Sequence, residues 1–250
     1  MSIKNKVFDS CVYPKDYKFN SIKDLANNLK KNKIYRALCM SKPNTNLKLF
    51  FDNTLKFDNL VPIASLKGKK DLRLQLEKIK KIGFKFLKIH PRFLNLPITE
   101  NWKFYDNIFK LNEKYKLKIL LCTLNSWEKE PNDLDLVHFI FKISKKFKNQ
   151  KIILMHGGGS EILKYYEIFR FSENIFLDIS YSMMHYQKTS LEENFKFLMK
   201  KFDKRLILGS DFPCFNFNNF NKAIQKYSIN ITDEKKKNFM FQNLESLYSE

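Results

Sequence analysis

Long apolar runs are missing from this chain of 250 residues. No stretch approaches the roughly 20 consecutive apolar residues that a membrane-spanning helix needs. The first six residues also lack the apolar core of a signal peptide. The 4 cysteines are scattered and form no Cys-x-x-Cys pair, which favours reduced thiols over disulfides. We therefore expect a cytoplasmic protein that does not enter the membrane.

Arginine is scarce, although Lys and Arg together number 46 and the formal net charge is +20. Only 5 of these 46 residues are Arg, the side chain suited to bidentate contacts with phosphates and bases. The lysines are spread over nearly every expected helix, and Asn, Phe and Ile are also abundant, as an AT-rich genome favours. Compositional bias therefore accounts for the charge, and nucleic acid is not an expected partner.

Glycine-rich and proline-rich linkers are absent, and so are the GxGxxG and GxxxxGK[ST] phosphate-binding patterns. Strand-like apolar runs instead alternate with amphipathic stretches from end to end. This order predicts one α/β domain over residues 1–250 and favours a single (β/α)₈ TIM barrel over an open doubly wound sheet. The expected strands are 7–13, 35–40, 60–66, 84–90, 118–122, 151–155, 174–179 and 205–209. The expected helices include 70–82, 102–115, 134–147, 161–171, 191–202 and a final helix that begins at an N-cap Thr232.

Polar residues stand where several of these apolar runs end. His156 follows the run 151–155 and precedes three glycines, and Asp211 follows the run 205–209. The carboxyl ends of strands are where TIM barrels carry their catalytic groups. Other residues at such ends are Cys11, Lys88, His90, Cys122 and Asp178. Side chains alternate along a strand, so Asp9, Cys11 and Tyr13 are expected to share a face, as are Lys88 and His90.

Four segments carry the sequence patterns of one known family. They are 83–93, with its Lys-Ile-His-Pro; 151–159, with His-Gly-Gly; 208–213, with Gly-Ser-Asp-Phe-Pro; and 232–248, with an Asn near its end. In this order and spacing the chain resembles the amidohydrolase-related, metal-dependent TIM-barrel hydrolases. The resemblance implies a hydrolase that cleaves an amide, ester or lactone bond in a small carbonyl or carboxylate substrate, or an enzyme that decarboxylates one.

The chain departs from the family at positions where the metal is usually held. The first strand of the family ends in a His-x-His pair, but Cys11 and Tyr13 stand there, and Cys122 replaces the histidine of the fifth strand. His156 and Asp211 match the pattern. One divalent ion, zinc, is the expected cofactor, with Cys11, Cys122, His156 and Asp211 as its ligands. In the alternative, the cysteines are small apolar fillers and no metal binds.

The resemblance also implies roles for these residues. The expected catalytic residues are Asp211 as general base for a metal-bound water, His156, and Lys88 near the developing oxyanion. Residues expected to bind the small-molecule substrate are His90, Arg92, Asp178 and His185. The alternative function is a catalytically inactive barrel that binds a metabolite or a partner protein. The sequence does not decide between a monomer and a homo-oligomer, because it does not distinguish an exposed apolar face from the buried face of a core helix.

Overall fold

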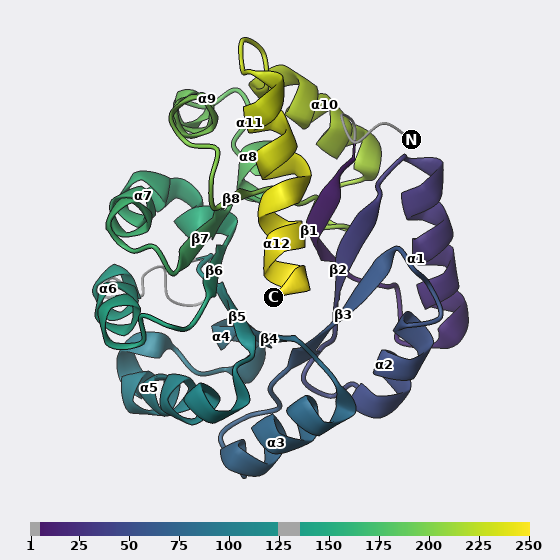
Figure 1. Ribbon diagram of the computed structural model, residues 1–250, viewed down its shortest axis with the longest axis vertical. Helices are drawn as coiled ribbons and strands as arrows, with labels where there is room; N and C mark the ends of the chain where they lie inside the picture. Colours follow the sequence, from purple (N-terminus) through teal and green to yellow (C-terminus); the bar gives the residue numbers. More distant parts are fainter. Residues whose placement is uncertain (1–5, 125–135) are drawn as a thin grey trace.

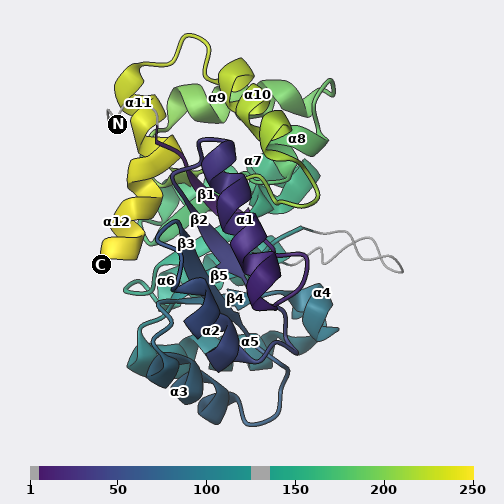
Figure 2. The same cartoon turned by 90° about the vertical axis from the view of Figure 1, so that its right-hand side faces the viewer.

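The computed structural model describes residues 6–124 and 136–250 of the chain. Eight parallel strands follow one another around the sheet in the order β1-β2-β3-β4-β5-β6-β7-β8, with helices on the outside (Figures 1 and 2). β8 returns to β1 through two backbone hydrogen bonds, from Ser10 N to Leu208 O at 3.0 Å and from Tyr13 N to Phe212 O at 2.9 Å. The prediction of a (β/α)₈ barrel is confirmed.

The expected strands are all found, with ends that differ by at most two residues. They are β1 (Phe8–Val12), β2 (Arg36–Met40), β3 (Leu60–Ser65), β4 (Phe86–Ile89), β5 (Lys118–Cys122), β6 (Ile152–Met155), β7 (Ile175–Asp178) and β8 (Leu206–Ile207). The helices are α1 (Phe19–Lys31), α2 (Leu47–Thr54), α3 (Leu72–Ile82), α4 (Pro91–Leu94), α5 (Ile98–Tyr115), α6 (Leu136–Lys146), η2 (His156–Glu161), α7 (Ile162–Phe171), α8 (Ser182–His185), α9 (Leu191–Lys201), α10 (Phe217–Tyr227), α11 (Asp233–Lys237), η3 (Asn238–Gln242) and α12 (Asn243–Ser249). Residues 134 and 135 of one expected helix lie outside the described residues.

Alternating side chains of the strands build two separate apolar cores. Phe86, Leu120 and Ile153 belong to the cluster inside the barrel, whereas their chain neighbours Leu87 and Leu121 belong to the larger cluster between strands and helices. This division follows from the two-residue period of a strand, because both faces of every strand are covered. The inner cluster leaves the carboxyl ends of the strands to polar residues.

A bulge interrupts this alternation on β1. The pairing register with β2 shifts between Asp9 and Val12, and Phe8 and Cys11, three positions apart, both belong to the inner cluster. Tyr13 packs against the same cluster, so it shares the inner face with Cys11 as expected. Asp9 Oδ1 instead accepts hydrogen bonds from the backbone N–H groups of Cys11 and Ser210. Because the bulge adds one residue to β1, the Asp9 side chain bonds to the backbone of β1 and of the segment after β8.

The C-terminal segment α11–η3–α12 lies across the end of the barrel that faces the viewer in Figure 1. Leu244 and Leu247 of α12 belong to the inner cluster, and they cover it from the amino-terminal ends of the strands. Asn243 Nδ2 fixes the segment to the start of β8 by donating to Asp203 O at 2.5 Å and to Leu206 O at 2.7 Å. The expected closing helix is confirmed, with a π-helical turn in its middle.

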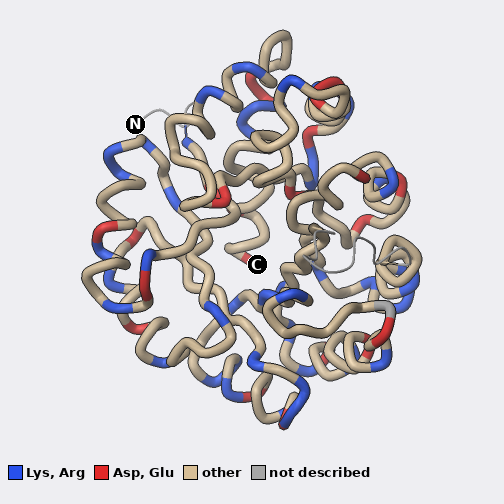
Figure 3. Tube along the Cα trace, turned by 180° about the vertical axis from the view of Figure 1, so that it is seen from behind, with Lys and Arg blue, Asp and Glu red and all other residues tan. Residues whose placement is uncertain are grey.

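Basic residues are spread around the outer helices, as the view from behind shows (Figure 3). They do not gather over one element in this view, which is the distribution that the composition leads us to expect. Over residues 6–124 and 136–250, no helix has both the length and the apolarity that crossing a membrane requires.

Candidate active site

The predicted site residues lie together at the carboxyl ends of the strands. Seven of them are buried, each no more than 9 % exposed: Cys11, Lys88, His90, Cys122, His156, Asp178 and Asp211. Burial of so many ionisable groups is costly unless they bond one another, so their partners define what the site can do.

Cys11 and Asp211 form one pair, between β1 and the segment after β8. The Cys11 Sγ donates a hydrogen bond to Asp211 Oδ1 at 3.1 Å. Burial raises the pKa of the Cys11 thiol well above its ordinary value, and the Asp211 carboxylate adds to this effect, whereas Lys88 opposes it. Cys11 is therefore a protonated thiol that orients a carboxylate.

Lys88 and Tyr13 form a second pair, between β4 and the end of β1. The Lys88 ammonium donates a hydrogen bond to Tyr13 Oη and lies 4.6 Å from the centre of the Tyr13 ring. Burial alone lowers the pKa of Lys88, but its neighbours, among them Tyr13 to which it donates a hydrogen bond, outweigh burial and raise the pKa. The barrel mouth therefore contains a fixed positive charge.

Cys122 stands at the end of β5, the strand between β4 and β6, and its pKa is affected by His90 after β4 and His156 after β6. Burial raises the pKa of Cys122, but the two histidines outweigh it and bring the pKa well below its ordinary value. Burial lowers the pKa of His156, yet Cys122 and the nearby carboxylates raise it to about 9. Burial lowers the pKa of His90. The two shifts have opposite directions, so Cys122 and His156 each favour the charged form of the other.

Asp178 at the end of β7 holds the backbone around His156. Its Oδ1 accepts hydrogen bonds from Ser10 Oγ at 2.7 Å and Ser180 N at 3.1 Å. Its Oδ2 accepts from Ser180 Oγ at 2.5 Å and His156 N at 3.3 Å. Burial raises the pKa of Asp178. Both carboxylate oxygens thus bond to the protein. Their partners Ser10 and Ser180 are site residues that sequence reasoning missed, because serines next to strand ends have no distinctive pattern.

The three glycines after His156 allow the chain to turn sharply at the mouth. Gly157, Gly158 and Gly159 all have positive φ, as does His156 with φ of 66°. A Cβ on Gly158 would lie 2.1 Å from the Tyr165 ring, so no larger residue fits there. The glycine run thus serves close packing and left-handed backbone.

The four predicted zinc ligands do not form one donor set. Cys11 donates a hydrogen bond to Asp211, which follows the neighbouring β8, whereas Cys122 stands on β5, beside the strand that precedes His156. β1 and β5 lie on opposite sides of the barrel (Figure 1), and a cysteine side chain is too short to reach across. In residues 6–124 and 136–250, no three His, Cys, Asp or Glu side chains come together in a way that could hold a metal ion. The described residues do not fit the expected zinc site.

The two remaining predicted residues lie at the rim. His185 is exposed and stacks on Tyr181 with ring centres 4.8 Å apart. Tyr181 in turn meets the His156 ring edge-on at 6.0 Å. Arg92 is partly buried, and its charge acts on the pKa values of His90 and Tyr181. His185 and Arg92 therefore lie beside the mouth, where an entering molecule would contact them.

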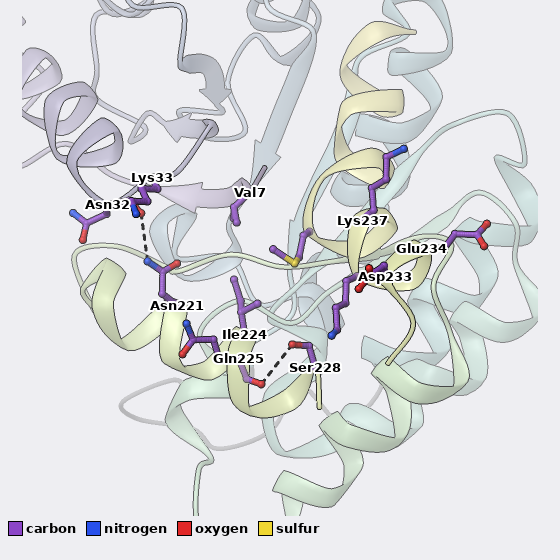
Figure 4. A pocket seen from close by; sticks show the side chains of 12 residues that line it. Val7, Asn32, Lys33, Asn221, Ile224, Gln225, Ser228, Asp233, Glu234 and Lys237 are labelled. Atoms are coloured by element: carbon purple, nitrogen blue, oxygen red, sulfur yellow. Dashed lines mark hydrogen bonds between the residues drawn. The ribbon is translucent and has the colours of Figure 1, made fainter. Parts of the chain in front are cut away.

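Two hollows lie at opposite ends of the barrel. A groove of about 590 Å³ borders the mouth and is lined by residues from the loops after β1, β2 and β4, among them Tyr17, Lys42 and Phe93. A cavity of about 760 Å³ lies beside the start of β1, between the ends of α1 and α10 and the start of α11 (Figure 4). Its lining includes Val7, Lys33 and Lys237, and none of the predicted site residues. The second hollow is separate from the candidate active site.

No family model and no curated protein matches the sequence. Solved structures match along nearly the whole chain. An uncharacterised TIM-barrel protein from Bordetella bronchiseptica aligns with a TM-score of 0.77 at 12 % identity, over 98 % of this chain and 99 % of that one. Dihydroorotase from Campylobacter jejuni aligns with a TM-score of 0.69 at 16 % identity, over 98 % and 83 %. The 2,6-dihydroxybenzoate decarboxylase from Rhizobium aligns with a TM-score of 0.61 at 12 % identity, over 98 % and 98 %.

At these identities the likenesses concern the fold. The chain is a TIM barrel with the same architecture as a dihydroorotase and a decarboxylase, both of which are enzymes by name.

Proposed function

We propose that this protein is an enzyme of the amidohydrolase-related type. It hydrolyses an amide, ester or lactone bond in a small substrate with a carbonyl or carboxylate group, or decarboxylates such a substrate. One observation carries the proposal: Lys88 on β4, His156 directly after β6 and Asp211 in the segment after β8 are all buried at the carboxyl end of the barrel. The fold shared with dihydroorotase and 2,6-dihydroxybenzoate decarboxylase supports it.

The chemistry follows from the charge that each of these side chains carries. The Lys88 ammonium is placed to attract a substrate carbonyl or carboxylate oxygen, and its burial strengthens that attraction. Asp211 accepts a hydrogen bond from Cys11 and is the group to take a proton from water. His156, with its pKa raised to about 9, is protonated at neutral pH and can donate a proton to a leaving group.

The test is a panel of small substrates with the Asp211→Asn variant. The panel contains dihydroorotate, 2,6-dihydroxybenzoate, simple lactones and aryl esters, and turnover is followed by absorbance. We expect Asp211→Asn to lose activity by at least about 100-fold, as expected when a general base is removed, while its circular dichroism stays unchanged. Asp203→Asn is the matched control, because Asp203 lies at the other end of the barrel, near Asn238. Full turnover by Asp211→Asn would exclude this mechanism.

The second candidate function is a barrel that binds a metabolite or partner protein without catalysis. Two hydrogen bonds favour this second function, the one between Lys88 and Tyr13 and the one between Cys11 and Asp211. They occupy Lys88 and Asp211, two groups that a reaction would use. It predicts that compounds of the panel raise the melting temperature of the protein without being converted. Measuring both properties on one preparation separates the two functions.

A further inference from the structure

Lysines stand where three consecutive strands begin, at the end of the barrel that faces the viewer in Figure 1. Lys118 is the first residue of β5, and Lys85 and Lys151 directly precede β4 and β6. Backbone hydrogen bonds join the strands at this level, from Lys118 N to Lys85 O at 3.0 Å and from Ile119 N to Lys151 O at 3.0 Å. These three residues, the lysine cluster, therefore stand side by side on neighbouring strands, at the end of the barrel opposite the candidate active site.

The side chains of Lys118 and Lys151 are partly buried and lie on the inner face of the barrel. The residues two positions further along β5 and β6 belong to the inner cluster, and side chains two apart on a strand share a face. The contacts agree, because Lys118 Nζ lies 5.8 Å from the centre of the Phe86 ring and Lys151 Nζ lies 6.0 Å from the centre of the Phe176 ring. Two ammonium groups are therefore held on neighbouring strands over rings of the inner cluster.

Lys85 is held next to this pair by the end of α12. Its ammonium donates a hydrogen bond to Tyr248 O at 2.7 Å and lies 4.7 Å from the centre of the Tyr248 ring. Burial lowers the pKa of Lys118, and the charges of Lys85 and Lys80 lower it further, whereas Glu250 opposes the shift. The positive charges at the start of β4 and β5 are therefore close enough to repel one another.

The charge of the lysine cluster is not balanced as it is at the start of β2. There Arg36 Nη1 donates to both carboxylate oxygens of Glu245 on α12, at 3.0 and 2.8 Å. Among the described residues, Lys118 and Lys151 form no such ion pair with a carboxylate. A partly buried charge without a counter-charge is costly, so an anion that supplied one would be attracted. The starts of β4, β5 and β6 therefore carry an excess of positive charge.

A further hollow, of about 570 Å³, borders the lysine cluster beside α12. Its lining includes Lys204 and Phe176, and Lys151 lies over the ring of Phe176. Glu245 also lines this hollow, but its carboxylate is already bonded to Arg36. The hollow therefore leaves room for a small molecule next to Lys151 and brings a fourth lysine to it.

We propose that the lysine cluster is a binding site for a small oxyanion with two or more negative charges, of the phosphate or pyrophosphate class. Neighbouring strands are about 4.8 Å apart, so the flexible side chains of Lys118 and Lys151 can donate to different oxygens of one anion. Lys85 donates one N–H to Tyr248 and keeps two further donors. The site lies at the far end of the barrel from the mouth and does not depend on the catalytic function proposed above.

The experiment is a calorimetric titration of the full-length protein with inorganic pyrophosphate at constant ionic strength. We expect saturable one-to-one binding to the wild type and a loss of affinity of at least about tenfold in Lys118→Gln and in Lys151→Gln. Lys118→Arg keeps the charge and should keep the binding. Lys33→Gln is the matched control, because Lys33 lines the separate cavity at the same end of the barrel (Figure 4), and its affinity should equal that of the wild type.

Melting temperatures separate a binding role of these lysines from a structural one. Without pyrophosphate, Lys118→Gln should melt at the same temperature as the wild type or above it, because the substitution removes one of the charges that repel one another. With saturating pyrophosphate the wild type should melt at the higher temperature, because the ligand stabilises only the protein that binds it. A lower melting temperature of Lys118→Gln in both conditions, by the same amount, would assign Lys118 a structural role and contradict the proposal.

Two further results would overturn the proposal. One is the absence of saturable pyrophosphate binding, or equal binding by the wild type, Lys118→Gln and Lys151→Gln. The other is an equal rise in melting temperature with sodium chloride at the same ionic strength, because that rise would come from screening alone. Titration with ADP separates a nucleotide from a free oxyanion, and ADP binding that Lys118→Gln weakens would support the site with a nucleoside diphosphate as its ligand.

Discussion

Asp9 gives a prediction about stability that is independent of any substrate. Its side chain is fully buried, and Oδ2 has no hydrogen-bond partner among the described residues. Burial raises the pKa of Asp9 from 3.8 to about 7, although hydrogen bonds from Ser210 and Cys11 oppose the shift. The folded protein therefore favours the protonated carboxyl more than the unfolded chain does.

The sign and size of the effect follow from these two pKa values. Because the folded value is the higher one, the contribution of Asp9 to stability is complete below about pH 4 and is lost as the pH rises through about 7. Between about pH 5.5 and about pH 8.5 the loss amounts to about 2 kcal/mol. Asp9→Asn keeps an oxygen for the N–H groups of Cys11 and Ser210 but cannot ionise.

The assay is urea-induced unfolding followed by circular dichroism at the two pH values. Relative to wild type, Asp9→Asn should gain about 2 kcal/mol in free energy of unfolding on going from the lower to the higher pH. Asp58→Asn is the control, since the Asp58 side chain is 88 % exposed, and its difference from wild type should stay within about 0.5 kcal/mol at both pH values. Parallel pH dependences of wild type and Asp9→Asn would refute the assignment of a buried, neutral carboxyl.

Two further predictions concern packing at the two ends of the barrel. Gly209→Ala should destabilise the protein by about 1–3 kcal/mol in urea unfolding, because its Cβ would lie 2.3 Å from Ser10 Oγ, and adding Ser10→Ala should recover part of the loss. If the urea midpoint of Gly209→Ala equalled that of wild type, β1 and β8 could separate without a loss of stability. Asn243→Ala should cost about 1–3 kcal/mol in the same measurement, because it leaves the carbonyl oxygens of Asp203 and Leu206 without their donor. The exposed Gln242→Ala is its control, and equal effects of the two variants would contradict the role of Asn243 as an anchor.

The barrel could be predicted from the sequence because a strand buried on both faces is a local signal. The segments 119–122 and 152–155 are apolar throughout, and each is followed by a polar residue, Thr123 or His156. The placement of His156 and Asp211 at the mouth follows from the same signal. The bulge on β1 could not be foreseen in this way, since it depends on how β1 meets β2 and β8.

The partners of the site residues were harder to predict. The resemblance to a metal-dependent family suggested that Cys11 and Cys122 converge, but they stand on β1 and β5, which lie on opposite sides of the barrel (Figure 1). Cys11 instead donates a hydrogen bond to Asp211, which follows the neighbouring β8. His156, which follows the neighbouring β6, affects the pKa of Cys122. Partner choice thus depends on side-chain length and strand adjacency, which single positions in a sequence do not reveal.

The ammonium of Lys88 has a consequence for how the mouth obtains its positive charge. A bound ion must be taken up after folding, and it can be exchanged or removed. Lys88 is covalently part of β4, so its charge is present in every folded molecule and in a one-to-one ratio with the barrel. A step that relies on this charge does not wait for an ion to be taken up to supply it.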